Sequence, residues 1–506
     1  MSFFFTVGAF FVTVEKRARG GTMDLRALLG NTLKRQLMLL EALHTKGERT
    51  SEELMAELDC SLPVLLNDIR FIAQELPAFA IEKHKGFYHL KLAEQTDFGQ
   101  VYRWALAQSP ECQILEVLLY EHCENIAELA KQLFLSFSKT QRALKRVEQE
   151  LQKLMIQLHY RPLRLGGSEP VIRHLYYRYF QERQLGLSHL FSELEARDIT
   201  LFVDQFLEQN GFRYQRIFVE RARLSFVISM WRIKRGHRIA PKRRTFQLPE
   251  GKTWTNCSQA LQARLGLKLS ERKAQDALWL HYHDELIFSA DHLEQALTDP
   301  IYHRRFQWHR QLIDCFDQLL QTPLSGTERE RLTVLLQNAS FLYPAACPPL
   351  DVLRRPRQDF LSVVAQMDLQ AVTGTYQMIA AFLADSGWHP DFGELYTYLL
   401  LSGTSEVLLR LKQQTSSQIL LVSDLTPTVE FFLLEQIQRL IYGRYQLLIQ
   451  SHYQESDLSQ LVIDAVITTG PDTDLGVPTL VIDPALSPAT IAKLQQLVNH
   501  LSNHKN

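Results

Sequence analysis

Cysteine is scarce in this chain, and the six cysteines among 506 residues form no C-x-x-C pair. Zinc clusters and disulfide frameworks need paired or regularly spaced cysteines, so neither is indicated, and a reducing cytoplasmic compartment fits. We therefore expect no metal site and no cofactor. Net charge is also small, at −1, which disfavours indiscriminate coating of nucleic acid and confines any nucleic-acid binding to one region.

Long hydrophobic runs are missing as well. The apolar stretch 3–14 is too short to span a bilayer, and its basic residues follow it instead of preceding it as in a signal peptide. We expect no membrane association. Residues 1–22 are expected to be an N-terminal extension, because the recognisable domain pattern begins at Met23. A chain of this length predicts several domains.

The clearest local pattern, in residues 105–178, is a helix-turn-helix followed by a wing. Asn125 can cap a short helix at 126–133, residues 134–137 form a compact turn, and a second helix at 138–151 begins on Ser138 as a further cap candidate. Leu144, Val147 and Leu151 recur at helical spacing and should face inward. The polar residues that this leaves for DNA binding are Ser138, Lys139, Gln141, Arg142, Lys145 and Arg146.

Basic residues are locally in excess here, with nine against three acidic residues between positions 138 and 178. A recognition helix of this composition lies in the major groove, where Arg, Lys and Gln reach base edges and phosphates. The segment therefore predicts binding to double-stranded DNA.

Residues 23–95 repeat the plan with fewer basic groups. We expect helices at 31–46, at 52–58 capped by Ser51, and at 62–76, followed by an alternating segment at 79–92 that turns at Gly86. The candidate DNA contacts on this unit are Ser61, Asn67 and Arg70. A lone unit of this kind could equally be a packing module, but two in tandem, both with wings, favour DNA binding.

The middle of the chain predicts two all-α bundles, at 182–290 and 291–405, separated by proline-rich breaks. Helices are expected at 224–235 and 270–285 in the first bundle and at 306–320, 327–338, 360–383 and 392–401 in the second. A basic run from Arg232 to Arg244 is interpreted as a solvated face. No catalytic constellation is visible, so we expect no enzymatic activity.

The last segment, 416–503, is predicted to contain strands as well as helices, unlike the all-α bundles before it. Buried-strand patterns at 418–423, 445–450, 461–468 and 479–482 alternate with helical patterns at 429–442 and 488–501. Strands that alternate with helices predict a small parallel α/β domain.

This order of domains, and the stretch 133–147 followed by 163–177, resembles the Mga-type global transcriptional regulators of Gram-positive bacteria, which include the anthrax-toxin regulator type. The resemblance covers about residues 23–503. It implies two N-terminal winged helix-turn-helix units, two PRD-like domains of the kind regulated by the sugar phosphotransferase system, and a C-terminal EIIB-like domain. It also implies a virulence-type DNA-binding regulator that forms a homodimer or higher oligomer through its C-terminal half, with the phosphocarrier protein as a candidate further partner.

The same resemblance points to phosphorylated histidines in the PRD-like domains. Ser225 and Leu401 occupy two of the expected histidine positions, which leaves His283, or its neighbour His281, as the candidate. A metal role for this pair is disfavoured, because neighbours two apart on a helix point to different faces.

Ser423 and Asp424 stand where an active IIB component carries a nucleophilic cysteine, so this domain is interpreted as an interaction module. Two alternatives remain open. One is an RNA-binding antiterminator with the same regulatory domains, disfavoured because such proteins begin with a β-rich domain. The other is a phosphotransferase-system component, disfavoured by Ser423.

Overall fold

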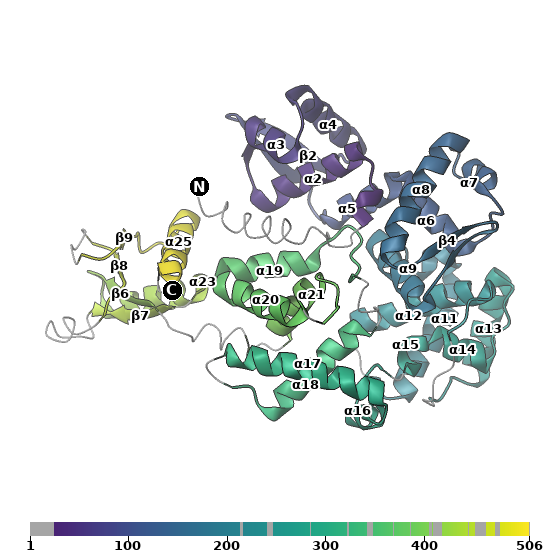
Figure 1. Cartoon of the computed structure of the whole chain (residues 1–506). Helices are drawn as coiled ribbons and strands as arrows, with labels where there is room; N and C mark the ends of the chain where they lie inside the picture. The colour runs from purple at the N-terminus through teal and green to yellow at the C-terminus, as the bar shows by residue number, and fades with distance from the viewer. Residues whose placement is uncertain are drawn as a thin grey trace. The chain divides into compact units, whose positions relative to one another are not determined.

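The computed structural model describes residues 25–212, 216–239, 246–283, 285–320, 323–341, 348–367, 369–384, 386–403, 407, 417–443, 445–450, 462–470 and 476–504 (Figure 1). The chain divides into two compact units. We call residues 22–296 with 340–355 the amino-terminal unit, and residues 297–339 with 356–506 the carboxy-terminal unit. The expected extension at 1–22 lies outside the described residues.

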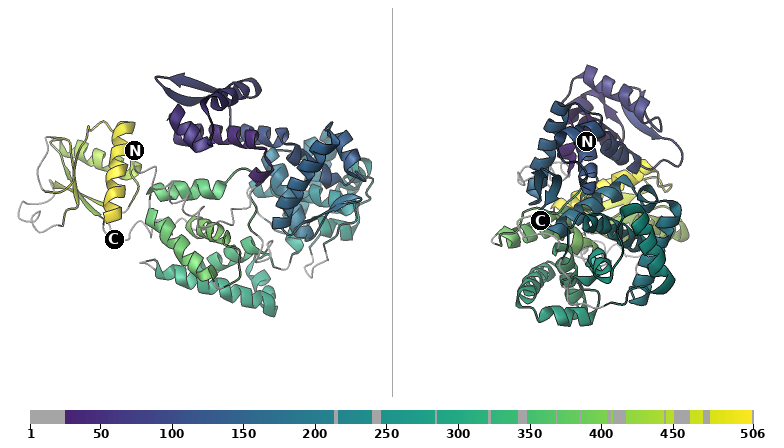
Figure 2. Two further views of the ribbon diagram at one scale, coloured as in Figure 1. Left: turned by 45° about the horizontal axis from the view of Figure 1, so that its top comes forward. Right: turned by 90° about the vertical axis from the view of Figure 1, so that its right-hand side faces the viewer.

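The first winged unit begins the amino-terminal unit. It comprises the short helix η1 (Leu25–Leu28), helices α2 (Asn31–Lys46), α3 (Ser51–Leu58) and α4 (Leu62–Glu75), and strands β1 (Arg49–Thr50), β2 (Phe79–His84) and β3 (Phe87–Leu92). The strands form an antiparallel sheet in the order β1-β3-β2, and the β2–β3 hairpin projects beyond the helices (Figure 2).

Two local details of this unit differ from the sequence prediction. Strand β1 was not predicted. The cap of α3 is Thr50 and not Ser51: the Thr50 side chain accepts from the amide of Glu53, whose carboxylate in turn accepts from the amide of Thr50. This reciprocal capping box satisfies two amides at once, which a serine one residue later could not do.

The second winged unit follows. Its elements are α5 (Gly99–Gln108), α6 (Pro110–Tyr120), α7 (Ile126–Gln132), α8 (Phe137–Lys153), strands β4 (Gln157–Tyr160) and β5 (Leu163–Gly166), and α9 (Glu169–Arg183). β4 and β5 pair antiparallel as the wing. The helix-turn-helix and wing that the sequence predicts are both present.

The first helical bundle contains α10 (Leu187–Leu190), α11 (Glu193–Gln209), α12 (Arg216–Lys234), α13 (Gly251–Leu265), α14 (Glu271–Ala277), α15 (Trp279–Tyr282) and α16 (Ala290–Leu297). The single helix predicted at 270–285 is wrong. The chain breaks between α14 and α15 at Leu278, and α15 ends before His283.

Residues 348–355 return to the amino-terminal unit and bridge two of its parts. The amide of Leu25 donates to the carbonyl of Val352 at 2.8 Å, and the Arg26 guanidinium donates to the carbonyl of Leu353. On the other side, one carboxylate oxygen of Glu182 accepts from the amides of Leu353 and Arg354, at 2.9 and 2.8 Å. This segment therefore links the first winged unit to α9.

In the carboxy-terminal unit, the second bundle contains α17 (Pro300–Gln318), α18 (Gly326–Ser340), α19 (Pro356–Met367), α20 (Leu369–Ala384) and α21 (Phe392–Ser402). The helix predicted at 360–383 is thus two helices. At the core of this bundle the buried His309 ring contacts the Gln337 side chain at 2.8 Å and the Tyr396 hydroxyl at 2.7 Å. Burial lowers the pKa of His309 to about 3, so the ring is neutral near pH 7.

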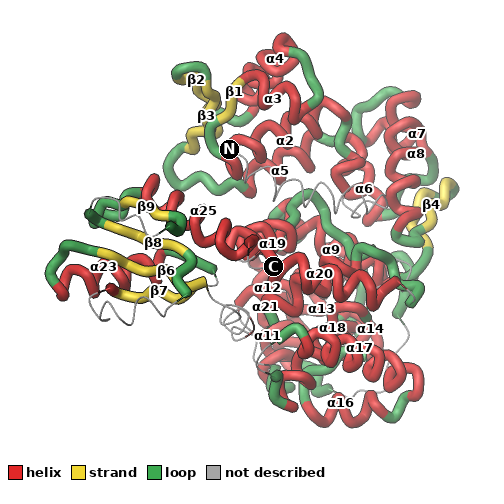
Figure 3. The backbone as a smooth tube through the Cα atoms, turned by 60° about the vertical axis from the view of Figure 1, so that its left-hand side comes forward, coloured by secondary structure: helices red, strands yellow, loops and turns green. Residues whose placement is uncertain are grey.

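The small α/β domain has strands β6 (Ser417–Val422), β7 (Tyr445–Ile449), β8 (Ala465–Thr468) and β9 (Thr479–Val481), and helices α23 (Pro427–Leu440) and α25 (Pro488–His504). The sheet is parallel in the order β7-β6-β8-β9 (Figure 3), which confirms the predicted parallel α/β class. Ile419 and Leu421 of β6 pack in one core with Leu433 of α23 and Leu494 of α25. Both helices therefore cover the same face of the sheet.

Among the described residues, no helix is both long and apolar enough to cross a membrane, and no three His, Cys, Asp or Glu side chains are grouped so that they could hold a metal ion. The five cysteines within this part of the chain are free thiols.

Candidate nucleic-acid interface

Helix α8 is held in its unit by a row of buried apolar side chains, and both helices of the motif, α7 and α8, begin at a capping residue. Asn125 caps α7, accepting from the amides of Ala127 and Glu128, as predicted. Leu144, Val147 and Leu151 are completely buried, as predicted. The cap of α8 is Ser136, whose hydroxyl accepts from the Lys139 amide, so the prediction of Ser138 as the cap is wrong. Both serines fit the local pattern, and the helix begins one residue earlier, at Phe137.

The outer face of α8 is exposed and carries the predicted polar side chains. Ser138, Lys139, Gln141, Arg142 and Lys145 all lie on the surface. The Arg142 guanidinium donates to the Ser138 carbonyl at 3.3 Å, one turn earlier on the same helix. The ammonium groups of Lys139 and Lys145 have no side-chain partner in the described part of the chain, so both remain available to phosphates.

Arg146 is half exposed on α8, but it is not free of partners. Its guanidinium forms an ion pair with the Glu111 carboxylate of α6, and Glu111 is almost completely buried. A cation that neutralises a buried carboxylate is held by the fold, since removing it would leave that charge uncompensated. Arg146 therefore holds α8 against α6 and is not a free cation of the outer face.

The wing lies beside the recognition helix and is joined to it by a hydrogen bond. The Tyr160 hydroxyl of β4 donates to the Glu148 carboxylate of α8 at 2.8 Å. Burial, together with this bond, raises the pKa of Tyr160 to about 12, so the hydroxyl keeps its proton. Arg161 and Arg164 are exposed on the wing, adding positive charge next to α8.

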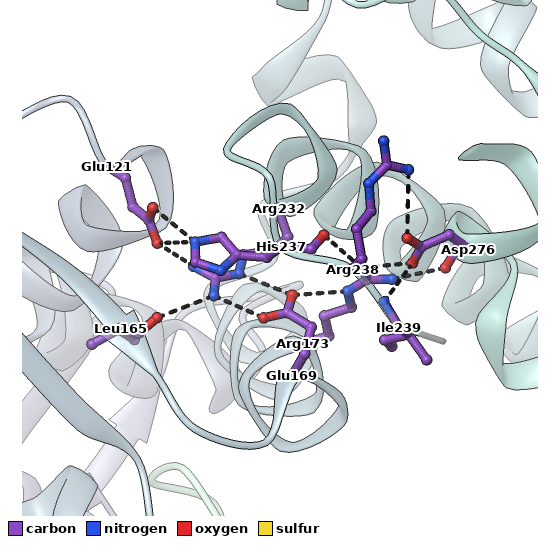
Figure 4. A network of polar contacts seen from close by, with 9 residues as sticks. All are labelled: Glu121, Leu165, Glu169, Arg173, Arg232, His237, Arg238, Ile239 and Asp276. Atoms are coloured by element: carbon purple, nitrogen blue, oxygen red, sulfur yellow. Dashed lines mark hydrogen bonds and ion pairs between the residues drawn. The ribbon is translucent and has the colours of Figure 1, made fainter. Parts of the chain in front are cut away.

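The base of the wing is held by a buried network of charged side chains (Figure 4). Arg232 of α12 is completely buried and donates to the Glu121 carboxylate, to the Glu169 carboxylate and to the Leu165 carbonyl of β5. Arg173, also buried, contacts Glu169 at 3.0 Å. Burial alone would raise the pKa of Glu169, but hydrogen bonds and charge from the two guanidiniums outweigh it and hold this pKa below its usual value.

The network extends further into the first bundle. The His237 ring contacts the Glu121 carboxylate at 2.8 Å, and Arg173 pairs with Asp276 of α14 at 2.8 Å. The interpretation of the basic run from Arg232 onward as a solvated face is thus wrong for Arg232, because carboxylates distant in sequence surround it. Residues 240–245 lie outside the described residues.

The first winged unit presents a less basic face. Ser61, Asn67 and Arg70 are exposed along α4, as are the apolar side chains of Leu62 and Leu66. On its inner side α4 is anchored by Asp68, which accepts from Arg35 and Gln36 of α2. Arg70 is the one basic residue of α4, so contact with DNA through this helix stays a prediction.

Both candidate phosphorylation sites are buried. The His281 ring lies among Phe206, Phe212 and Phe288, and burial lowers its pKa to about 4. His283 is also buried, and its Nδ1 accepts from the Glu285 amide. α15 ends at Tyr282, and both rings lie in the core, so phosphorylation of either histidine stays a prediction. A phosphocarrier protein could reach neither ring without local opening.

In the α/β domain, the first turn of α23 already holds a carboxylate. The Ser423 hydroxyl donates to the buried Glu430 side chain at 2.7 Å, and Asp424 accepts from the Thr469 hydroxyl at 3.0 Å. Negative charge at this place repels a phosphoryl group, which agrees with the interpretation of the domain as an interaction module.

Two surface residues of the interface were missed in the sequence, namely Phe134 and Phe137. They were assigned to the turn between the helices without a role, yet both expose their rings next to the outer face of α8. Two phenylalanines within four residues of a short turn between predicted helices are the signal that could have indicated them.

Comparison with known proteins finds a match over this part of the chain. Residues 94–180 match the Mga helix-turn-helix domain, which spans α5 to α9. The chain is 20% identical over 329 residues to a trans-acting regulator of Streptococcus pneumoniae, covering 63% of this chain and 66% of that protein. It is 28% and 26% identical to the capsule synthesis positive regulators AcpB and AcpA of Bacillus anthracis, over 42% and 41% of this chain.

These matches span 66%, 45% and 44% of the relatives' own lengths. They do not extend over whole proteins, but all three relatives carry names of regulators. The predicted resemblance to the Mga-type transcriptional regulators is therefore confirmed, and it is carried by residues 94–180, which match the Mga helix-turn-helix domain.

Proposed function

We propose that this protein is a cytoplasmic DNA-binding transcriptional regulator that reads duplex DNA with α8, and that it has no enzymatic activity. The observation that carries the proposal is the outer face of α8. This face exposes Lys139, Gln141, Arg142 and Lys145 beside a basic wing, while the opposite face of α8 is buried in the core. Given the names of the relatives, genes of the capsule or virulence class are the proposed targets.

The test replaces the two central cations of this face, as Arg142→Ala with Lys145→Ala. Each lost phosphate contact should lower the slope of log affinity against log salt by up to about one unit. The measurement is a mobility-shift salt series on the region upstream of the protein's own gene, with circular dichroism to verify folding.

The matched control is Arg197→Ala with Lys252→Ala, two exposed basic residues on α11 and α13 of the first bundle. This pair should leave affinity and slope unchanged. If the α8 pair also leaves both unchanged while folding is normal, α8 is not the reading helix.

We further propose that the two bundles act as PRD-like domains and that the EIIB-like α/β domain carries self-association into a homodimer or higher oligomer. Supporting this, Phe431 and Phe432 expose 57% and 61% of their surface on α23. Removal of residues 416–506, or Phe431→Ser with Phe432→Ser in the full chain, should shift the protein toward monomer in light scattering. The same oligomer in wild type and both variants would contradict this assignment, and Leu194→Ser on α11 serves as the exposed-apolar control.

A further inference from the structure

Two aromatic rings lie on the surface where the turn of the second helix-turn-helix meets α8. Phe134 exposes 96% of its surface and Phe137 exposes 51%. Leu133 and Leu135, on either side of Phe134, are half-buried. Isolated apolar side chains on a protein surface are common, but two phenyl rings so close together in the chain lose the stabilisation that burial would give both of them. The pair therefore calls for an explanation beyond ordinary surface exposure.

The turn presents the Phe134 ring on an ordered backbone. The Phe134 amide donates to the Lys131 carbonyl at 3.3 Å, and the Leu135 amide donates to the Ala130 carbonyl at 3.0 Å. Phe134 has a φ of 53°, in the left-handed region that favours glycine or asparagine over a bulky aromatic residue. The chain thus carries a phenyl ring at a position where a smaller residue would fit the backbone better.

Phe137 is the first residue of α8, and it shares a stripe of the helix with Gln141 and Lys145, four and eight residues later. The same two helices also expose cations, namely Lys139 and Arg142 on α8 and Lys131 on α7. An apolar spot inside a cationic face complements a polyanion that displays apolar groups. Duplex DNA has this character, because each thymine places a C5-methyl group in the major groove.

We propose that Phe137, together with Phe134, recognises thymine through its C5-methyl group at the edge of the α8 footprint. The inference rests on the proposed function of α8 as the reading helix, and it adds a base preference to the phosphate contacts. The lysines and Arg142 hold the helix in the groove, and the phenyl rings distinguish a methylated pyrimidine from one without the methyl group.

The test compares thymine with deoxyuridine, which lacks only this methyl group and keeps the same Watson–Crick pairing. A duplex is first selected by the wild-type protein from a random library, and each thymine is then replaced singly. Loss of one buried methyl, roughly 0.8 kcal/mol, should weaken wild-type binding about fourfold at one or two positions. Fluorescence anisotropy gives the affinities.

The variants assign these positions to the rings. Phe137→Ala should bind thymine and deoxyuridine duplexes equally at one of them, and Phe137→Leu, which keeps apolar reach, should restore much of the difference. Phe134→Ala should remove the response at a neighbouring thymine. Leu194→Ala, an exposed apolar residue on α11, should respond as the wild type does.

Failures of the two proposals are distinguishable. A wild-type protein that selects no duplex overturns the function of α8 itself. A protein that binds its duplex tightly, but with no methyl response at any thymine, overturns the role of the rings and leaves the function intact. Phenylalanine variants that keep the methyl response and change only the oligomeric state in light scattering assign the rings to a protein contact, which also overturns the inference.

Discussion

Arg232→Ala is expected to destabilise the amino-terminal unit, because Arg232 is the centre of the buried network at the base of the wing. The substitution leaves the Glu121 and Glu169 carboxylates, whose side chains are 7% and 11% exposed, without their main partner. Breaking a buried ion pair in this way costs about 3–5 kcal/mol. His237 and Arg173 still contact these carboxylates, so we expect the lower end, about 3 kcal/mol.

A loss of about 3 kcal/mol corresponds to a fall in Tm of roughly 6–12 °C for a domain of 150–250 residues. Calorimetry measures that fall, and hydrogen–deuterium exchange of peptides from β5 and α12 locates it. Arg232→Met separates charge from volume, since it keeps the packing of the stem while removing the guanidinium. Arg197→Ala, at an exposed arginine, is the control and should change Tm little.

The pH dependence of stability is a second test of the role of Arg232. In the wild type the pKa of Glu169 is depressed, so its contribution is present above its unfolded pKa and is lost as pH falls through the lower folded value. Without Arg232 this pKa should rise, so the deficit of the variant should shrink as the solution is acidified. If Arg232→Met is as stable as the wild type at neutral pH, the two carboxylates do not need the guanidinium and the reasoning is refuted.

Two further substitutions test separate features. Burial lowers the pKa of His281 in the folded protein to about 4, so the protein loses stability as the pH falls from about 6.5, where the unfolded ring takes up a proton, toward 4. His281→Leu should remove up to about 1.4 kcal/mol per pH unit from the slope of unfolding free energy against pH, measured by urea titration. Equal slopes in the two proteins would contradict the burial argument. Asn125→Ala removes two capping bonds from α7 and should cost about 1 kcal/mol, with faster amide exchange in α7. Unchanged exchange at Ala127 and Glu128 would show that water replaces the cap.

Features that follow from the spacing of residues along the chain were predictable from the sequence. The inward stripe of α8 follows from helical spacing alone, and all three predicted residues are buried. The parallel sheet likewise follows from apolar runs alternating with helical segments, and its four strands lie close to the predicted ranges. Boundaries were less certain, because Ser136 and Ser138 are chemically equivalent cap candidates.

Burial of polar residues was not predictable in this way. Arg232 stands in a basic run, and the carboxylates that make its burial possible are 63 and 111 residues away. His281 and His283 were placed on a continuous helix, but the break at Leu278 turns them into the core. In each case tertiary contacts decide the environment, and no local pattern carries that information.

The pairing of basic side chains with buried carboxylates, more than the number of basic residues, limits which of them the proposed interface can use. Of the basic residues between positions 138 and 178, Arg146, Arg173 and Arg178 are each bound to a carboxylate that the fold buries. Lys139 and Lys145 have no such partner among the described residues, and they lie on one exposed helix face. Under the proposed function, phosphate contacts at this helix would come from Lys139, Arg142 and Lys145, because the carboxylates beside Arg146, Arg173 and Arg178 already balance the charge of those three arginines. One of these pairs, Arg146 with Glu111, also fixes α8 to α6. The residue that holds the helix in place is therefore different from the residues that we propose contact DNA, although all of them lie on the same helix.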